Sequence, residues 1–186
     1  MLAIQEYISS FDNIEEANRY LEKNVSVVAK SSYIEKDKIF IYNTTKGYEE
    51  TGRLIREAEG LILDAQANVL CMYPLAPRAV TFAQLFAVEI NWHLARIEEM
   101  EDGIRCAAYR YQGNWHFATK ESATARQDLE YPEKSCIVFT TVKHEMEDIL
   151  RKNFGNWSAI FEGEDNSDLC FIFDFVVPGI TNIKPY

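Results

Sequence analysis

Two pairs of β-prone segments, each interrupted by a short polar turn, constrain the fold of this chain most strongly. The first pair spans residues 60–73, with a polar break in its middle. The second spans residues 105–119, and Gln112-Gly113-Asn114 supplies a tight turn between its halves. Hairpins join antiparallel strands directly, whereas parallel strands need a long crossover between them. The sequence therefore predicts an α+β fold built on antiparallel sheets.

An amphipathic helix is predicted near the start of the chain, over residues 12–23. Asp12 is the expected N-cap, and Glu15 three residues later completes a capping-box pattern. The expected buried face of this helix consists of Ile14, Ala17, Tyr20 and Leu21. Strands are predicted at residues 25–29 and 38–43. Residues 1–37 thus form an N-terminal helix with a lead-in strand.

The last third of the chain is expected to add one helix and one strand. Apolar residues at helical spacing predict a helix over residues 143–154, which ends before Gly155. Residues 168–177 are long, apolar and β-prone, which predicts a central strand. The chain contains no internal repeat and no linker-like tract, so residues 1–186 are expected to form a single domain.

Composition limits the classes of function that this chain can serve. Its 186 residues carry 19 Lys and Arg against 29 Asp and Glu, a formal charge of −10. This balance disfavours nucleic-acid binding through a broad basic surface, although RNA remains a conceivable partner through a local basic pocket. No apolar run reaches the length of a membrane span, and the first residues do not resemble a secretion signal. We therefore expect a cytoplasmic protein that does not engage a membrane.

The residues most often used for metal binding and nucleophilic catalysis form no recognisable pattern. The four cysteines are widely spaced and are expected to be buried free thiols in a reducing compartment: Cys71, Cys106, Cys136 and Cys170. The histidines, which we expect to be structural or exposed, are His93, His116 and His144. The acidic run at residues 98–102 fits a solvated turn, and a divalent-cation site is the alternative.

Three segments carry more specific information, and they occur in a defined order. Residues 56–64 read REAEGLILD, residues 100–103 read MEDG, and the second hairpin that follows ends in ATKES at residues 118–122. Residues 173–178 read FDFVVP. In order and spacing, these segments resemble the nucleotidyltransferase domain of ATP-dependent RNA ligases of the bacteriophage tRNA-repair type. The resemblance extends over roughly residues 38–186.

The resemblance implies a fold, two ligands and a set of site residues. The expected fold is the antiparallel-sheet core of an ATP-grasp-like RNA/DNA ligase adenylation domain, preceded by a helix. The implied ligands are ATP and Mg²⁺. From their positions in the motifs, the residues expected to contact the nucleotide are Glu101, Asp102, Gly103 and Lys120. Asp174 is expected to hold a metal-bound water.

Some of the implied site residues also have a plainer explanation, which is weaker for Asp174. Asp102 and Gly103 could form a tight turn that needs the conformational freedom of glycine. Lys120 could be an ordinary surface lysine. Asp174 lies in an apolar run, and a carboxylate buried there would need a partner.

The departures from the family pattern bear directly on catalysis. In the family, a lysine amine attacks the α-phosphate of ATP, but this position is Met100 here, and a thioether cannot form the phosphoramidate. Glu59 replaces an arginine and Glu121 replaces a glycine, which puts two anions where phosphate charge would have to be stabilised. Thr181 stands where an arginine is expected. The family's later strands, with Glu-Gly and Lys-x-Lys motifs, are expected to be missing after Tyr186.

These departures lead to one principal hypothesis and two alternatives. The principal hypothesis is a catalytically degenerate RNA-ligase-like protein, a pseudo-enzyme that serves as a binding or assembly module for a protein partner. The first alternative is a divergent ATP-dependent RNA ligase completed by a partner chain that supplies the missing strands. The second is an acidic mimic of nucleic acid, suggested by the charge of −10.

Overall fold

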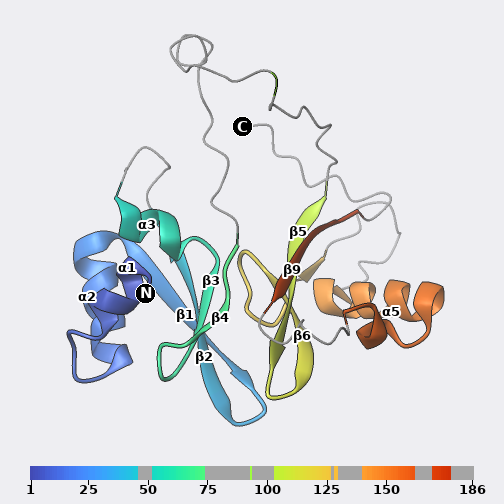
Figure 1. Cartoon of the computed structure of the whole chain (residues 1–186), viewed down its shortest axis with the longest axis horizontal. Coiled ribbons are helices and arrows are strands. Elements are labelled where there is room, and N and C mark those ends of the chain that lie inside the picture. Colours follow the sequence, from blue (N-terminus) through green and yellow to red (C-terminus); the bar gives the residue numbers. More distant parts are fainter. Residues whose placement is uncertain are drawn as a thin grey trace.

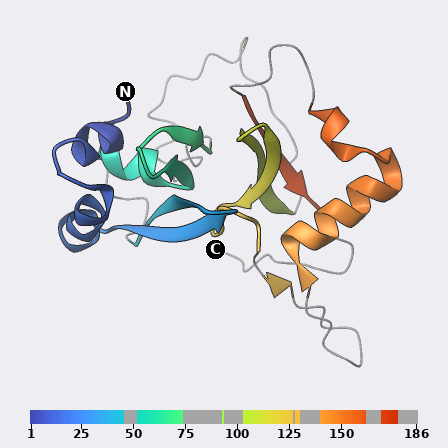
Figure 2. The same ribbon diagram turned by 90° about the horizontal axis from the view of Figure 1, so that it is seen from below.

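The computed structural model describes residues 1–45, 52–73, 93, 103–126, 128–129, 140–161 and 169–176. These residues form a mixed fold of helices and antiparallel sheets, which confirms the predicted α+β class. The two main sheets stand face to face, and helices cover the outer face of each (Figure 1). The view from below shows the same sequence of layers: helices, sheet, sheet, helix (Figure 2).

The first sheet contains four antiparallel strands in sequence order. They are β1 (Val27–Ile34), β2 (Asp37–Thr44), β3 (Leu61–Asp64) and β4 (Val69–Cys71). Its outer face is covered by α1 (Ala3–Ile8), α2 (Ile14–Val25) and α3 (Arg53–Ala58). The predicted hairpin at residues 60–73 is confirmed as β3 and β4. The strand predicted at residues 25–29 begins two residues later and runs to Ile34.

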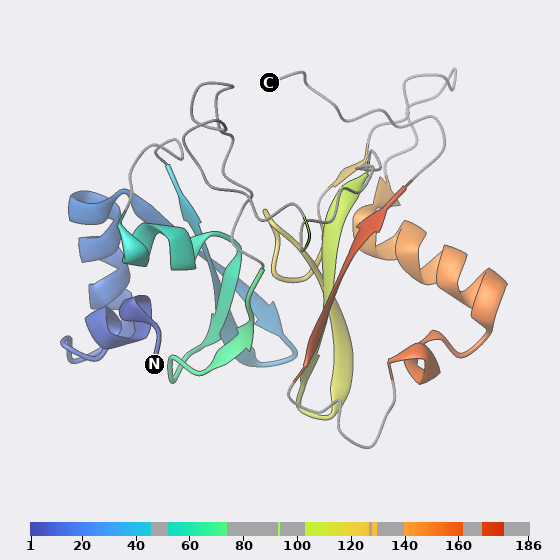
Figure 3. The same cartoon turned by 45° about the horizontal axis from the view of Figure 1, so that its top comes forward.

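The second sheet has three antiparallel strands in the order β6-β5-β9 (Figure 3). They are β5 (Ile104–Tyr111), β6 (Asn114–Thr119) and β9 (Cys170–Phe175). The outer face of this sheet packs against α5 (Val142–Phe154). The prediction of a central strand near the end of the chain was wrong, because among the described strands β5 is central and β9 pairs on one side only. The apolar character of β9 instead reflects packing on both of its faces.

Three short elements complete the described structure. A 3-10 turn, η1 (Trp157–Ile160), follows α5, and the two-residue strands β7 (Asp128–Leu129) and β8 (Thr140–Thr141) pair with each other. In the part of the chain that the structure describes, no helix combines the length and the apolar character needed to cross a membrane.

Alternation along the strands divides the apolar residues among three cores. In β2, Phe40 and Tyr42 pack against the helices, whereas Ile39 and Ile41 face the second sheet. Both sheets are therefore buried on both faces, which explains why their strands are nearly continuous apolar runs. The core between the sheets, the inter-sheet core, contains Ile34, Ile39, Ile41, Ile62, Cys71, Tyr73, Ala107, Tyr109, Ala118 and Ala123.

The first helices differ from the prediction in their cap and in one face residue. The N-cap of α2 is Asn13 rather than Asp12: its side chain accepts a hydrogen bond from the Glu16 amide at 2.8 Å. Glu15 closes no capping box and instead pairs with Lys38 on β2 at 3.1 Å. Tyr20 is 48% exposed rather than buried, while the other three predicted face residues are buried.

The short helix α1 was not predicted, because distant residues stabilise it. The buried Glu57 carboxylate on α3 accepts a hydrogen bond from the Ala3 amide at 2.6 Å and pairs with Arg53. A carboxylate at the start of a helix complements the unpaired amides there. This contact spans 54 residues of sequence, so no local pattern reveals it.

The later turns and caps follow the sequence closely. Gln112 (φ 51°) and Gly113 (φ 80°) form the two-residue loop of the second hairpin, and positive φ at both positions matches the twist of the strands. The Thr141 hydroxyl accepts a hydrogen bond from the His144 amide and caps α5. The helix ends at Gly155, as predicted.

Gly60 yields a stability prediction. It has a φ of +73°, and a Cβ added there would lie 2.8 Å from Cδ2 of the Tyr73 ring. Gly60→Ala should lower the free energy of unfolding by about 2–4 kcal/mol, because the left-handed backbone and the clash both oppose a side chain. Urea unfolding measures the loss. Gly113→Ala is the matched control, because it has a similar φ with nothing within 4 Å, and should lose only about 1–2 kcal/mol. Equal losses would contradict the steric argument.

His116 yields a pH prediction. Burial lowers the pKa of its half-buried imidazole from the ordinary 6.5, and among the described residues its Nε2 has no hydrogen-bond partner. The unfolded chain then binds the proton more readily, so stability should fall as the pH drops below 6.5, by up to about 1.4 kcal/mol per pH unit.

A substitution isolates the contribution of His116. His116→Phe keeps a ring beside Tyr109 and Tyr111 and cannot be protonated, so the loss of stability between pH 7 and pH 5.5 should become smaller. Urea unfolding at several pH values measures this slope. His144→Gln is the control, because it removes a histidine that is exposed rather than half-buried. A slope that His116→Phe does not alter would refute the assignment.

Candidate functional site

Three of the predicted site residues meet at one end of the second sheet. Gly103 directly precedes β5, Lys120 directly follows β6, and Asp174 is the last residue but one of β9. In an antiparallel sheet, the start of a central strand lies beside the ends of its neighbours. The register places Cys106 opposite Thr119 and Arg105 opposite Asp174. Segments separated by up to 71 positions in the sequence therefore converge.

This end of the sheet also faces the first sheet. Ala107 lies in the inter-sheet core, and Arg105 is two residues earlier on the same face of β5. Asp174 is paired directly with Arg105 and lies on that face too. We call this region the polar end: it consists of Lys30, Asn43, Glu59, Arg105, Lys120, Glu121 and Asp174, where the inter-sheet core gives way to charged side chains.

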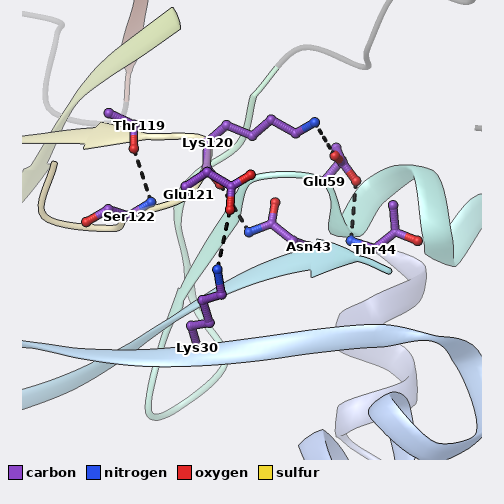
Figure 4. Close-up of polar contacts among 8 residues, drawn as sticks. All are labelled: Lys30, Asn43, Thr44, Glu59, Thr119, Lys120, Glu121 and Ser122. Atoms are coloured by element: carbon purple, nitrogen blue, oxygen red, sulfur yellow. Dashed lines mark hydrogen bonds and ion pairs between the residues drawn. The ribbon is translucent and has the colours of Figure 1, made fainter. Parts of the chain in front are cut away.

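Lys120 pairs with Glu59 across the two sheets. Glu59 directly follows α3, which packs on the first sheet, and its side chain points toward the Lys120 ammonium (Figure 4). The Glu59 carboxylate also accepts a hydrogen bond from the Thr44 amide at 3.3 Å, and the side chain is only 12% exposed. Glu59, the anion that the resemblance placed where phosphate charge would have to be stabilised, is thus the partner of Lys120.

Asn43 supports the loop that carries Lys120. Its Nδ2 donates a hydrogen bond to the Lys120 carbonyl at 3.1 Å (Figure 4). Its Oδ1 is buried and has no hydrogen-bond partner among the described residues. Next to Lys120, Glu121 pairs with Lys30 on β1 at 3.3 Å, and both of these side chains are more than half exposed. Two ion pairs therefore tie this loop to the first sheet.

Asp174 is engaged by Arg105. Its two carboxylate oxygens accept hydrogen bonds from Nε and Nη2 of Arg105 at 3.0 and 3.2 Å. This contact raises the pKa of the Arg105 guanidinium, so the arginine stays charged. The side chain of Asp174 is 32% exposed, so its position in an apolar run did not bury it. A metal ion at Asp174 would compete with Arg105 for the same two carboxylate oxygens. Among the described residues, no group of three or more His, Cys, Asp or Glu could hold a metal ion.

Gly103 is required for close packing rather than for its backbone conformation. Its φ does not lie in the left-handed region, so the explanation through conformational freedom was wrong. A Cβ at this position would lie 3.0 Å from the Phe175 carbonyl oxygen and 3.3 Å from Cγ2 of Val176. A side chain at this position would therefore require the end of β9 to shift by a few tenths of an ångström. This observation neither requires nor excludes a nucleotide.

The remaining site predictions lie outside the described residues. These are Met100, Glu101 and Asp102, together with the rest of the acidic run at residues 98–102. Cys136 and Thr181 also lie outside them. The geometry of the polar end is therefore built from Gly103, Lys120, Asp174 and the partners that they meet.

The charges of the polar end compensate one another. Each of its three basic side chains has a carboxylate partner: Lys30 with Glu121, Lys120 with Glu59, and Arg105 with Asp174. Phosphoryl transfer requires positive charge directed at the phosphates. Here an incoming phosphate would have to displace a carboxylate from each cation. The arrangement is suited to holding two sheets together and poorly suited to stabilising a triphosphate.

Sequence reasoning missed two contributors to this region. Arg105 was not singled out, although β5 and β9 are both predicted strands and an arginine opposite an aspartate is a common cross-strand pair. Asn43 was missed because its role depends on the Lys120 carbonyl, 77 residues away. The sequence analysis singled out Glu59, but its pairing with Lys120 could not be predicted because it depends on how the two sheets pack together.

Comparisons of this chain with protein-family models, with curated proteins and with solved structures found no match. The resemblance to RNA ligases therefore depends on the three sequence segments themselves. The convergence of Glu59, Gly103, Lys120 and Asp174 is a property of this fold, whatever its ancestry.

The Lys120–Glu59 pair predicts a measurable coupling. Because Glu59 is almost buried, a double-mutant cycle with Lys120→Met and Glu59→Gln should give a coupling free energy of about 1–2 kcal/mol. The free energy of unfolding in urea is the quantity to measure. The control cycle uses Lys30→Met and Glu121→Gln, an exposed pair that should give about 0–0.5 kcal/mol. A coupling no larger than the control would show that the Lys120–Glu59 pair contributes little.

Proposed function

We propose that this protein is a catalytically degenerate RNA-ligase-like module that binds or assembles with a protein partner and does not transfer adenylate. The observation that carries the proposal is the pairing of Lys120 with Glu59. A nucleotidyltransferase site needs an uncompensated cation near the phosphates, and at this position the ammonium is held by a nearly buried carboxylate. Met100 at the expected nucleophile position supports the same conclusion, because it cannot carry AMP.

The compensated charges support a structural use of the former site. Arg105–Asp174 links the starting residues of β5 to the end of β9, and Lys120–Glu59 links the two sheets. These contacts stabilise a fixed surface, which a binding module needs. ATP and Mg²⁺ are not required for the proposed role. The free thiols of Cys71, Cys106 and Cys170 agree with the cytoplasmic location that we expect.

A divergent RNA ligase completed by a second chain is the alternative. The convergence of the three ligase-like segments at one end of the sheets favours it over an unrelated function. In this alternative, a second polypeptide supplies the missing cations and the Lys120–Glu59 pair opens on assembly. The acidic-mimic hypothesis receives less support, because the described carboxylates are distributed over several ion pairs in both halves of the molecule.

Incubation with labelled ATP and Mg²⁺, followed by denaturing electrophoresis, tests the proposal. We expect no covalent AMP on the wild-type protein, since the chain has no amine at the nucleophile position. We also expect ATP to leave the thermal unfolding midpoint unchanged, because a ligand that binds only the folded state must raise it. A covalent adduct on the protein alone would overturn the proposal. An adduct that forms only after a copurifying second chain is added would favour the alternative.

A charge substitution distinguishes a lost phosphate site from a region that never bound nucleotide. Glu59→Gln should remove the carboxylate that pairs with Lys120, so ATP should now bind at least tenfold more tightly than to the wild type, a gain of about 1.4 kcal/mol or more. Isothermal calorimetry measures the affinity. Glu121→Gln is the matched control, because it removes one acid from the exposed pair and leaves Lys120–Glu59 intact. Equal ATP affinities for all three proteins would contradict a phosphate-binding origin for the polar end.

A further inference from the structure

The thiols of Cys71 and Cys170 lie together between the two sheets. Cys71 is the last residue of β4 in the first sheet, and Cys170 is the first residue of β9 in the second. Cys71 is part of the inter-sheet core, and Cys170 packs against that core. Cys170 also donates a hydrogen bond to the carbonyl of Met72, the residue after Cys71, at 3.6 Å. Two distant segments thus present a matched pair of sulfur atoms.

We propose that Cys71 and Cys170 are a reversible oxidation site, at which a small-molecule disulfide such as oxidised glutathione converts the two thiols into a disulfide that joins the sheets. The site is independent of the function proposed above.

The accessibility of the two thiols differs in the way that this chemistry requires. Cys71 is 1% exposed, whereas Cys170 is partly exposed, which corrects the expectation that all the cysteines are buried. An oxidant can therefore reach Cys170 first. The neighbouring Cys71 thiol lowers the pKa of Cys170 from its usual range, which increases the fraction of this sulfur that is thiolate near neutral pH. The thiolate is the nucleophile in thiol–disulfide exchange.

The reaction proceeds in two balanced steps. The Cys170 thiolate attacks one sulfur of oxidised glutathione, forms a mixed disulfide and releases one glutathione thiolate. The Cys71 thiol then attacks the Cys170 sulfur and passes its proton to the leaving glutathione sulfur, which breaks the mixed disulfide and releases the second glutathione as a thiol. Overall, two protein thiols are oxidised to one disulfide and one glutathione disulfide is reduced to two thiols. Excess reduced glutathione reverses both steps.

The other described cysteine does not meet these conditions. Cys106 is fully buried in the core beneath α5, and its thiol donates a hydrogen bond to the Ile104 carbonyl at 3.2 Å. Burial raises the pKa of this thiol to about 12, so it stays protonated. Cys106 therefore provides a matched internal control.

Peptide mapping of the full-length protein without reduction tests the proposal. After incubation with oxidised glutathione at pH 7.5 and acid quenching, we expect the intact protein to lose two hydrogen atoms and one linked pair of peptides to contain Cys71 and Cys170. The cross-link closes a loop of roughly 100 residues, so the thermal midpoint should rise by about 5–15 °C and return after reduction. At pH 6.5, iodoacetamide should alkylate Cys170 first and so prevent the cross-link.

Variants separate this disulfide from other outcomes. Cys170→Ala should abolish both the cross-link and the rise in the midpoint, and Cys71→Ala should leave only a persistent glutathione adduct on Cys170. Cys106→Ala and Cys136→Ala should still form the cross-link. The proposal fails if the wild type stops at a glutathione adduct, if the linked peptides contain Cys106 or Cys136, or if no oxidation occurs. The wild-type map decides the matter even if Cys71→Ala does not fold, because it needs no variant.

Discussion

The contact between the two sheets is the interaction on which the rest of the structure depends. Tyr73 contributes most visibly, because its ring lies over Gly60 and its buried hydroxyl donates a hydrogen bond to the Ala118 carbonyl on β6. Tyr109 donates similarly to the Ala123 carbonyl. Burial raises the pKa of both phenols, which keeps them neutral hydrogen-bond donors in the core. Small residues opposite these rings, such as Ala107 and Ala118, let the sheets approach.

The polar end follows from the same packing. Where the apolar alternation of β5, β6 and β9 stops, Arg105, Lys120 and Asp174 occupy the positions beyond the core, and each needs a partner because water is partly excluded there. Glu59 satisfies Lys120 from the opposite sheet, and Asp174 satisfies Arg105 within its own sheet. An active transferase would leave such cations available to its substrate. Here these cations instead pair with carboxylates and hold the strand ends together.

The sequence was most informative where local rules decide the structure. Both hairpins, the end of α5 at Gly155 and the antiparallel α+β class follow from turn chemistry and periodicity. It was least informative where distant residues decide the structure. Helix α1 depends on Glu57, and the edge position of β9 among the described strands depends on its pairing with β5. At the site, the identities of Lys120 and Asp174 were predictable from motifs, but their partners depend on the approach of two sheets.

The polar end and the thiol pair are two separate links across the same core. Cys170 and Asp174 are four residues apart on β9, so the thiol pair lies about 13 Å along the strand from the Arg105–Asp174 pair of the polar end. Lys120–Glu59 is an ion pair and yields to competing charge, whereas a Cys71–Cys170 disulfide would not. A cross-link at one end would limit the relative movement of the sheets and so favour the Lys120–Glu59 contact at the other.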